Sequence, residues 1–420
     1  MNGELGGDEV PLGHRSAARR LVAVGGVKAM AEEQEAAGFS YWGSERVCAA
    51  CIADEALSRW VDGEGFAGEC SFCGTEQRVV VTIHNLFVEM GRCIQSEYTP
   101  DATMGGPVPT LDSSDVLYNL DDPLGEETRL REVFCEAFNT EWAERDWWTG
   151  SYDERLLFGW RQFAERVKRH SRFVFMHPKA APPAPAGLGP ADIAPADILD
   201  AIHEVIEDSG LIIPLPAGQL VYRGRKHHPD THYTTPDELG APPPRQARSQ
   251  RMNPAGISYF YAATDEATCL AELRGVEGDT ATVTGWVTRR NTFGVDLVRL
   301  PEIPSIFEPE PAYSRAALAF MRRFAQEIAK SLKPYDDPVV DYVPTQILSE
   351  YIRHCVTNGS GEAVEGVIYP SPARPGGTNI VFFVDDTDHS NPDGLLVMHE
   401  EPRRYEATEA ITHWRKIDGP

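Results

Sequence analysis

Long apolar runs are missing from this chain of 420 residues. A membrane-spanning helix needs about 20 consecutive, mostly apolar residues, and no stretch of the sequence approaches that length. The first residues also lack the basic and then apolar layout of a signal peptide. We therefore expect a cytoplasmic protein that does not cross a membrane.

Basic residues are scarce as well. The chain has 39 Lys and Arg against 64 Asp and Glu, which gives a formal net charge of -25. A surface of this charge repels phosphate backbones, so the composition argues against broad nucleic-acid binding. A small anionic ligand would need arginines that are held locally at its site.

Cysteines are few, and four of the eight form two C-x2-C pairs, Cys48 with Cys51 and Cys70 with Cys73. Two knuckles of this spacing can place four thiolates at the corners of a tetrahedron around zinc. The alternatives are four buried cysteines or two redox pairs. Because four thiolates would leave no open ligand position, we predict a structural zinc site that stabilises the fold.

The length of the chain predicts more than one domain. Residues 1–40 should form a disordered tail and a short helix, and residues 41–176 a helical domain that carries the cysteine pairs. Residues 177–195 are dominated by Pro and Ala, which is typical of a linker. Strands mixed irregularly with helices over residues 196–420 predict an α+β domain rather than a doubly wound sheet.

Residues 220–273 contain most of the candidate site residues. The stretch predicts a short strand, a long polar loop, an aromatic strand and a short helix, in that order. Its candidate residues are Arg223, Arg251, Asn253, Tyr261 and Glu272. Taken one at a time, such residues have ordinary interpretations as surface charges, a core aromatic and a solvated acid on a polar helix face.

The order of these residues resembles the RES family, which is named for an arginine, a glutamate and a serine. Arg223 corresponds to the arginine, Glu272 to the glutamate, and Ser371, which follows Tyr369 and Pro370, to the serine. Further matches are an Arg-x-Asn-x-x-Gly segment, an aromatic strand and a Gly-Gly-x-Asn segment, which contain Arg251, Asn253, Tyr261 and Asn379. The family fold is related to ADP-ribosyltransferases, so the resemblance implies a mixed β/α RES domain after the helical, zinc-bearing N-terminal domain.

Members of the family act on NAD, and relatives are known as NAD-degrading toxins of toxin–antitoxin pairs. The resemblance therefore implies an enzyme that cleaves the nicotinamide–ribose bond of NAD. It implies catalytic roles for Arg223, Glu272 and Ser371. It implies substrate contacts for Arg251, Asn253 and Tyr261. An antitoxin or other inhibitor protein and a homodimer are partners that the sequence leaves open.

Each implied role has a physical reason. Breaking the nicotinamide–ribose bond builds positive charge on the sugar, so the site needs a nearby carboxylate, which Glu272 would supply. Arg223 and Arg251 offer planar forks of donors for the pyrophosphate. Tyr261 offers a π face for the pyridinium cation, and Ser371 a hydroxyl for a ribose hydroxyl or a phosphate.

One departure from related enzymes concerns the acceptor. Arginine-modifying ADP-ribosyltransferases carry a second acid or amide two residues before the catalytic glutamate, and here that residue is Leu270. Transfer to a protein arginine is therefore disfavoured, which leaves water or inorganic phosphate as the acceptor. An ADP-ribosyltransferase acting on a protein or nucleic acid, and a non-catalytic nucleotide-sensing module, stay open as alternatives.

Residues 41–176 resemble the N-terminal domain of some RES proteins, which has been grouped with the HEPN superfamily. Many members of that superfamily are RNases, and their signature is an arginine at a fixed short spacing before a histidine. Here Arg161 lies too far from His170 and Arg166 too close to it. We therefore interpret His170 as an ordinary residue at a helix end and do not expect RNA cleavage.

Overall fold

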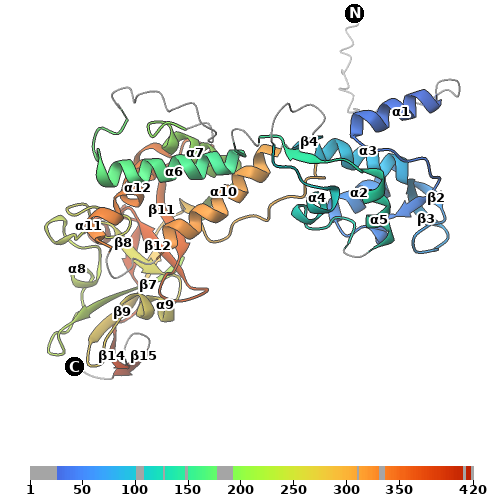
Figure 1. Ribbon diagram of the computed structural model, residues 1–420. Coiled ribbons are helices and arrows are strands. Elements are labelled where there is room, and N and C mark those ends of the chain that lie inside the picture. The colour runs from blue at the N-terminus through green and yellow to red at the C-terminus, as the bar shows by residue number, and fades with distance from the viewer. Residues whose placement is uncertain are drawn as a thin grey trace, which may run out of the picture. The chain divides into compact units, whose positions relative to one another are not determined.

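The computed structural model describes residues 26–100, 108–125, 128–146, 150–176, 193–309, 312–330, 336–409 and 413–417. Contacts between residues divide the chain into two compact units, Met1–Arg145 and Asp146–Pro420. Figure 1 shows the elements of the first unit in blue to teal and those of the second in green to red. Both units combine helices with sheets, which confirms the α+β class.

The first unit places helices around two small antiparallel sheets. Its helices are α1 (Gly26–Ala37), η1 (Ala49–Cys51), α2 (Glu55–Glu64), α3 (Ile83–Ile94), α4 (Ser113–Asn119) and α5 (Arg129–Ala137). Its strands are β1 (Arg46–Cys48), β2 (Phe66–Gly68), β3 (Arg78–Thr82), β4 (Tyr98–Pro100) and β5 (Trp142–Glu144). The sheets have the orders β1-β3-β2 and β4-β5.

Aromatic side chains fill the core of the first unit. Phe134 stacks on Phe138 with ring centroids 4.2 Å apart, and Phe87 meets Phe134 edge-on at 5.4 Å. All three rings are fully buried. Thr82 begins α3 by accepting a hydrogen bond from the backbone of Asn85, so the strand β3 passes directly into the helix that carries Phe87.

The second unit is built on a sheet of ten strands in the order β15-β14-β9-β7-β8-β12-β11-β10-β6, with β13 paired to β9. The strands are β6 (Ile212–Leu215), β7 (Leu220–His227), β8 (Phe260–Ala263), β9 (Thr280–Thr288), β10 (Thr292–Asp296), β11 (Val364–Pro370), β12 (Thr378–Phe382), β13 (Leu396–Met398), β14 (Arg403–Glu409) and β15 (His413–Ile417). β10 and β11 run parallel, and the other recorded pairs are antiparallel. This order makes β7, β8 and β12 neighbours although they lie far apart in the sequence.

Helices of the second unit cover one face of this sheet (Figure 1). The covering helices are α6 (Tyr152–Arg169), α7 (Ile198–Asp208), α10 (Ala312–Ala329) and α12 (Val343–Cys355). The unit also contains the shorter helices α8 (Pro236–Leu239), η3 (Pro244–Gln246), α9 (Glu266–Glu272), α11 (Pro338–Asp341) and η4 (Asp388–Ser390). Each long helix is amphipathic and buries an apolar stripe. Among the described residues, no helix has the length and apolar character that a membrane crossing requires.

Helix α6 packs with the second unit. Trp160 meets Phe324 of α10 edge-on at 4.9 Å, and Lys168 donates to Asp341 at 3.0 Å. The sequence placed this helix with the residues before the linker, because composition marks a break only where Pro and Ala accumulate. Trp160 and Phe163 are buried in a core shared with α10 and other elements of the second unit, and the domain boundary expected at residue 176 stays a prediction. The linker prediction itself falls mostly on residues 177–192, and the predicted tail mostly on residues 1–25, which lie outside the described residues.

Candidate functional site

Glu272, the last residue of α9, lies at the centre of a short hydrogen-bond network. Ser371 Oγ and Asn379 Nδ2 both donate to Glu272 Oε1, each at 2.6 Å. Ser371 is 9% exposed and Asn379 is 4% exposed, whereas Glu272 is partly exposed. The surface acid suggested by helix periodicity is therefore held from its buried side by two neutral donors.

The loop after β11 connects this network to the start of α9. Arg374 donates to Asp265 Oδ1 and to Thr268 Oγ1, both at 2.9 Å, and Asp265 itself caps the helix by accepting from the Thr268 backbone. A Cβ atom added at Gly377 would lie 2.7 Å from Thr268 Oγ1. Glycine at this position therefore lets the loop approach the helix that carries Glu272.

Tyr261 and Asn253 use their polar groups on each other and on the loop before β8. The Tyr261 hydroxyl donates to Asn253 Oδ1 at 2.7 Å and accepts from the Met252 backbone at 3.0 Å. Burial raises the pKa of Tyr261 well above its usual value, so the phenol stays protonated. Asn253 Nδ2 donates to three backbone carbonyls. The structure brings these two predicted residues together, and their contact with a substrate stays a prediction.

Arg251 binds the end of a helix. Its guanidinium donates to the carbonyls of Ile328 and Lys330, the latter at 2.8 Å, and lies 5.2 Å from the ring centroid of Tyr342. A cation is favourable at a helix C-terminus because the last carbonyls lack partners inside the helix. Since both terminal nitrogens already donate, a pyrophosphate at Arg251 would have to compete with the end of α10.

Arg223 bridges two strands at the point where their pairing stops. The ladder between β7 and β8 contains one register pair, and beyond it Arg223 Nη1 donates to the Tyr261 carbonyl at 2.7 Å. Its Nε donates to the carbonyls of Leu239 and Gly240. Burial lowers the pKa of Arg223 to about 10, so the group stays charged at neutral pH. Arg223 is thus a partly buried cation between strands and not a simple surface charge.

The structure does not join Arg223 directly to Glu272. Strand alternation places Arg223 with Phe260, whose ring centroid lies 4.8 Å from it, on one face of the sheet. Tyr261 and Asn379 face the opposite side. Within the described ranges, no hydrogen bond or ion pair connects the arginine with the carboxylate. The two groups are connected only through the sheet, because Arg223 holds the backbone of β8 and β8 pairs with β12, which carries Asn379.

Two residues beside Glu272 are not among the site residues expected from the sequence. Asn379 and Tyr369 oppose each other in the β11–β12 ladder. Burial, together with the nearby charge of Glu272, raises the pKa of Tyr369 above its usual value. The Gly-Gly-x-Asn segment after Ser371 was the available signal, but sequence spacing alone could not show that its amide reaches Glu272.

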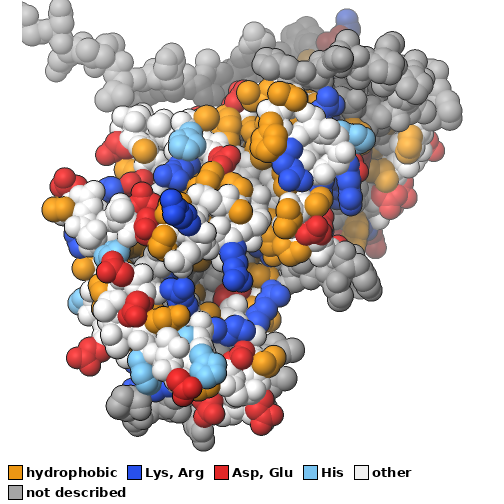
Figure 2. All heavy atoms as spheres, turned by 90° about the vertical axis from the view of Figure 1, so that its left-hand side faces the viewer, with side chains coloured by type: hydrophobic (Ala, Val, Ile, Leu, Met, Phe, Trp, Pro, Cys, Tyr) orange, Lys and Arg blue, Asp and Glu red, His pale blue; other side chains and the backbone are white. Residues whose placement is uncertain are grey.

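Charge is unevenly distributed over the second unit. Figure 2 shows one face on which basic side chains gather through the middle, while acidic side chains are more frequent toward the left-hand and lower edges. The net charge of -25 therefore does not describe every part of the surface. Local positive groups of this kind are what an anionic ligand requires of an acidic protein.

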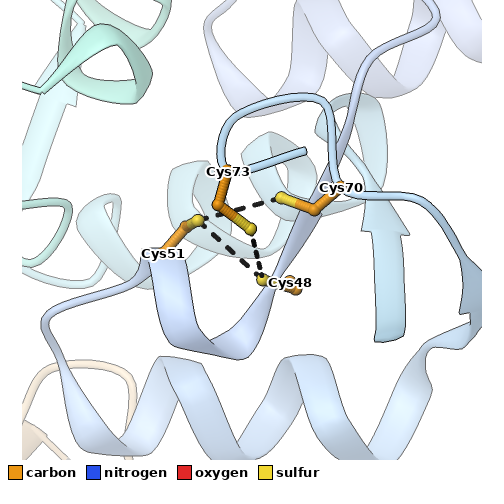
Figure 3. A group of neighbouring side chains, drawn as sticks. All are labelled: Cys48, Cys51, Cys70 and Cys73. Carbon is orange, nitrogen blue, oxygen red and sulfur yellow. Dashed lines mark hydrogen bonds between the residues drawn. The ribbon is translucent and has the colours of Figure 1, made fainter. Parts of the chain in front are cut away.

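The four predicted cysteines converge in the first unit (Figure 3). Their sulfur atoms lie within 4.8 Å of one another, and three pairs are 3.7 to 3.8 Å apart. Tetrahedral ligands about 2.3 Å from a metal would be spaced by about 3.8 Å. Burial raises the pKa of Cys48, whereas hydrogen bonds with Thr75 lower that of Cys73 to about 6. The cluster could hold a metal ion through four thiolates.

Comparison with known proteins gives two matches. Residues 220–403 match the model of the RES domain. Residues 64–181 match HEPN/RES N-terminal domain 1, so Cys48 and Cys51 precede this match while Cys70 and Cys73 fall within it. Comparison with curated proteins and with solved structures finds no match. The chain therefore combines a HEPN/RES N-terminal domain with a RES domain, as its sequence resemblance predicts.

Proposed function

We propose that the RES domain consumes NAD by breaking its nicotinamide–ribose bond, with water or inorganic phosphate as the acceptor. The observation that supports this most is the Glu272 carboxylate, which two buried donors hold through Oε1 in a partly exposed position. A fixed negative charge stabilises the oxocarbenium-like sugar that forms as nicotinamide leaves. Preorganisation matters because the carboxylate then needs no reorientation during the reaction.

The other predicted residues fit supporting roles. Tyr261 projects from β8 on the same face as Asn379, where its ring can meet the pyridinium cation. Arg223 supplies a partly buried positive charge on the other face of that strand. Its Nη2 has no hydrogen-bond partner among the described residues and is left to bind a phosphate oxygen beyond the end of the β7–β8 pairing. Arg251 would bind a phosphate only by giving up its hydrogen bonds to the Ile328 and Lys330 carbonyls. While it keeps them, its role is to hold the end of α10 in place.

We further propose that the cysteine cluster binds zinc and stabilises the first unit. Four thiolates are the donor set that structural zinc prefers, and the observed sulfur spacing fits its tetrahedral geometry. Zinc would remove the repulsion between thiolates that otherwise keeps buried cysteines protonated. This site takes no part in the proposed reaction, because all four positions belong to the protein.

The proposed activity corresponds to a toxin that depletes NAD and is controlled by an inhibitor protein. Such an assignment is tested by incubating the purified full chain with NAD, with and without phosphate, and measuring nicotinamide release. Water as the acceptor yields ADP-ribose, and phosphate yields ADP-ribose carrying an additional phosphate. Label from NAD on a protein or nucleic acid would instead favour an ADP-ribosyltransferase, and tight NAD binding without release would favour a sensing module.

A further inference from the structure

The hydroxyl of Ser371 has no hydrogen-bonding capacity left for a ligand. A serine hydroxyl offers one donor and two acceptor positions. Here it donates to Glu272 Oε1 at 2.6 Å and accepts from the backbone nitrogens of Ala373 and Arg374, both at 3.2 Å. A contact with ribose or phosphate would have to replace one of these three bonds.

Asn379 acts on the same oxygen from the neighbouring strand. Its Nδ2 donates to Glu272 Oε1 at 2.6 Å, and its Oδ1 is buried and has no partner within the described structure. Two donors on Oε1 fix the torsion of the carboxylate, while no hydrogen bond to Oε2 is found among the described residues. The two oxygens of Glu272 are therefore not equivalent.

We infer that Ser371 and Asn379 are positioning residues that together bind Oε1, so that Oε2 is the oxygen that faces the substrate. This inference rests on the proposed function and deepens it. It changes the role expected of Ser371, from a ligand of ribose or phosphate to a residue that acts through Glu272. It also adds Asn379 as its equal partner.

The loop geometry supports a role in positioning. The turn that presents the Ser371 hydroxyl is closed by hydrogen bonds from the Ser371 backbone to the Gly377 carbonyl, 2.9 Å, and from the Gly377 backbone to the Arg374 carbonyl, 3.0 Å. Arg374 in turn holds the first turn of α9 through Asp265. Both ends of the helix that carries Glu272 are thus bound to one loop.

Kinetics of the full chain with NAD test the inference. We expect Ser371→Ala and Asn379→Ala each to lower kcat about 10- to 100-fold while KM changes less than about twofold, because neither side chain touches the substrate. The double variant should lower kcat by less than the product of the two single reductions, since both side chains act through one oxygen. In a Glu272→Gln background, either change should leave the residual rate unaltered. Ser258→Ala, which removes a buried hydroxyl that binds the Pro242 carbonyl, is the matched control and should keep both constants.

A rise in KM with unchanged kcat in Ser371→Ala would overturn the inference, because it would place the hydroxyl on the substrate. If the wild-type chain releases no nicotinamide, the proposed function fails. Urea unfolding still tests whether the Ser371 hydroxyl interacts with Glu272. Ser371→Ala should lower the urea midpoint in the wild-type background and lower it less in a Glu272→Ala background, where its acceptor is gone. Equal shifts in both backgrounds would show that the pair does not act on Glu272.

Discussion

The two sites of this protein are assembled over very different distances along the chain. The hydrogen-bonded cysteine pairs are 3, 19 and 25 residues apart, and short turns after β1 and β2 bring them together. Ser371 and Asn379 lie 99 and 107 residues from Glu272, and only the sheet order makes them neighbours. The cysteine cluster therefore depends on local turns, whereas the carboxylate network depends on the packed core of the whole second unit.

The largest expected effect comes from removing the proposed metal ligands. Cys70→Ser, or treatment with a strong chelator, should abolish metal binding and the cooperative unfolding of the first unit, because structural zinc contributes about 10 kcal/mol or more in small domains. Metal content and thermal unfolding measure the change. Cys135→Ser, a thiol outside the cluster, is the control. A stable first unit without bound metal would contradict the proposed zinc site.

The corresponding test of the second unit removes part of its core. Phe163 of α6 is fully buried, so Phe163→Ala should lower the free energy of unfolding of the second unit by about 3–5 kcal/mol. Phe173→Ala, at a side chain that is 91% exposed, should change little. Urea unfolding followed by a probe in the second unit separates the two outcomes. Loss of stability confined to the first unit would show that α6 belongs there.

Replacing the carboxylate tests the chemistry without emptying the site. In Glu272→Gln the amide oxygen can still accept from Ser371 and Asn379, so the fold should persist while NAD consumption falls on the order of 10³-fold. Glu277→Gln, an exposed acid shortly after α9, is the matched control. Nicotinamide release measures both. Full activity in Glu272→Gln would remove the carboxylate from the reaction.

The smallest effect concerns pH. Burial opposes ionisation of Asp265, but hydrogen bonds from Thr268 and the charge of Arg374 outweigh it and lower the Asp265 pKa. A carboxyl with a lowered pKa stabilises the fold above its unfolded value of about 3.9 and loses this contribution as pH falls through the folded value. Asp265→Asn should therefore cost less than about 1 kcal/mol at pH 7, since the pair is partly exposed. The difference from wild type should shrink below about pH 4 in urea unfolding, and a difference independent of pH would contradict this assignment.

Those parts of the fold and of the sites that depend on short stretches of sequence could be predicted. The spacing of Cys48, Cys51, Cys70 and Cys73 predicted the cluster, and the order of strand, loop, strand and helix around Tyr261 and Glu272 followed from short patterns. The joining of α6 to the second unit could not be predicted. An amphipathic helix shows which of its faces is buried, but it does not show against which core.

The sequence by itself determined the residue types available for chemistry, the family resemblance and the thiolate cluster, because each depends on residues close together or in a fixed order. Tertiary structure alone decided that Ser371 and Asn379 share one oxygen of Glu272 and that Arg251 binds the end of α10. It also placed Arg223 between two strands rather than at a surface. These contacts depend on which strands become neighbours in the sheet, and that is settled by burial of the whole apolar core.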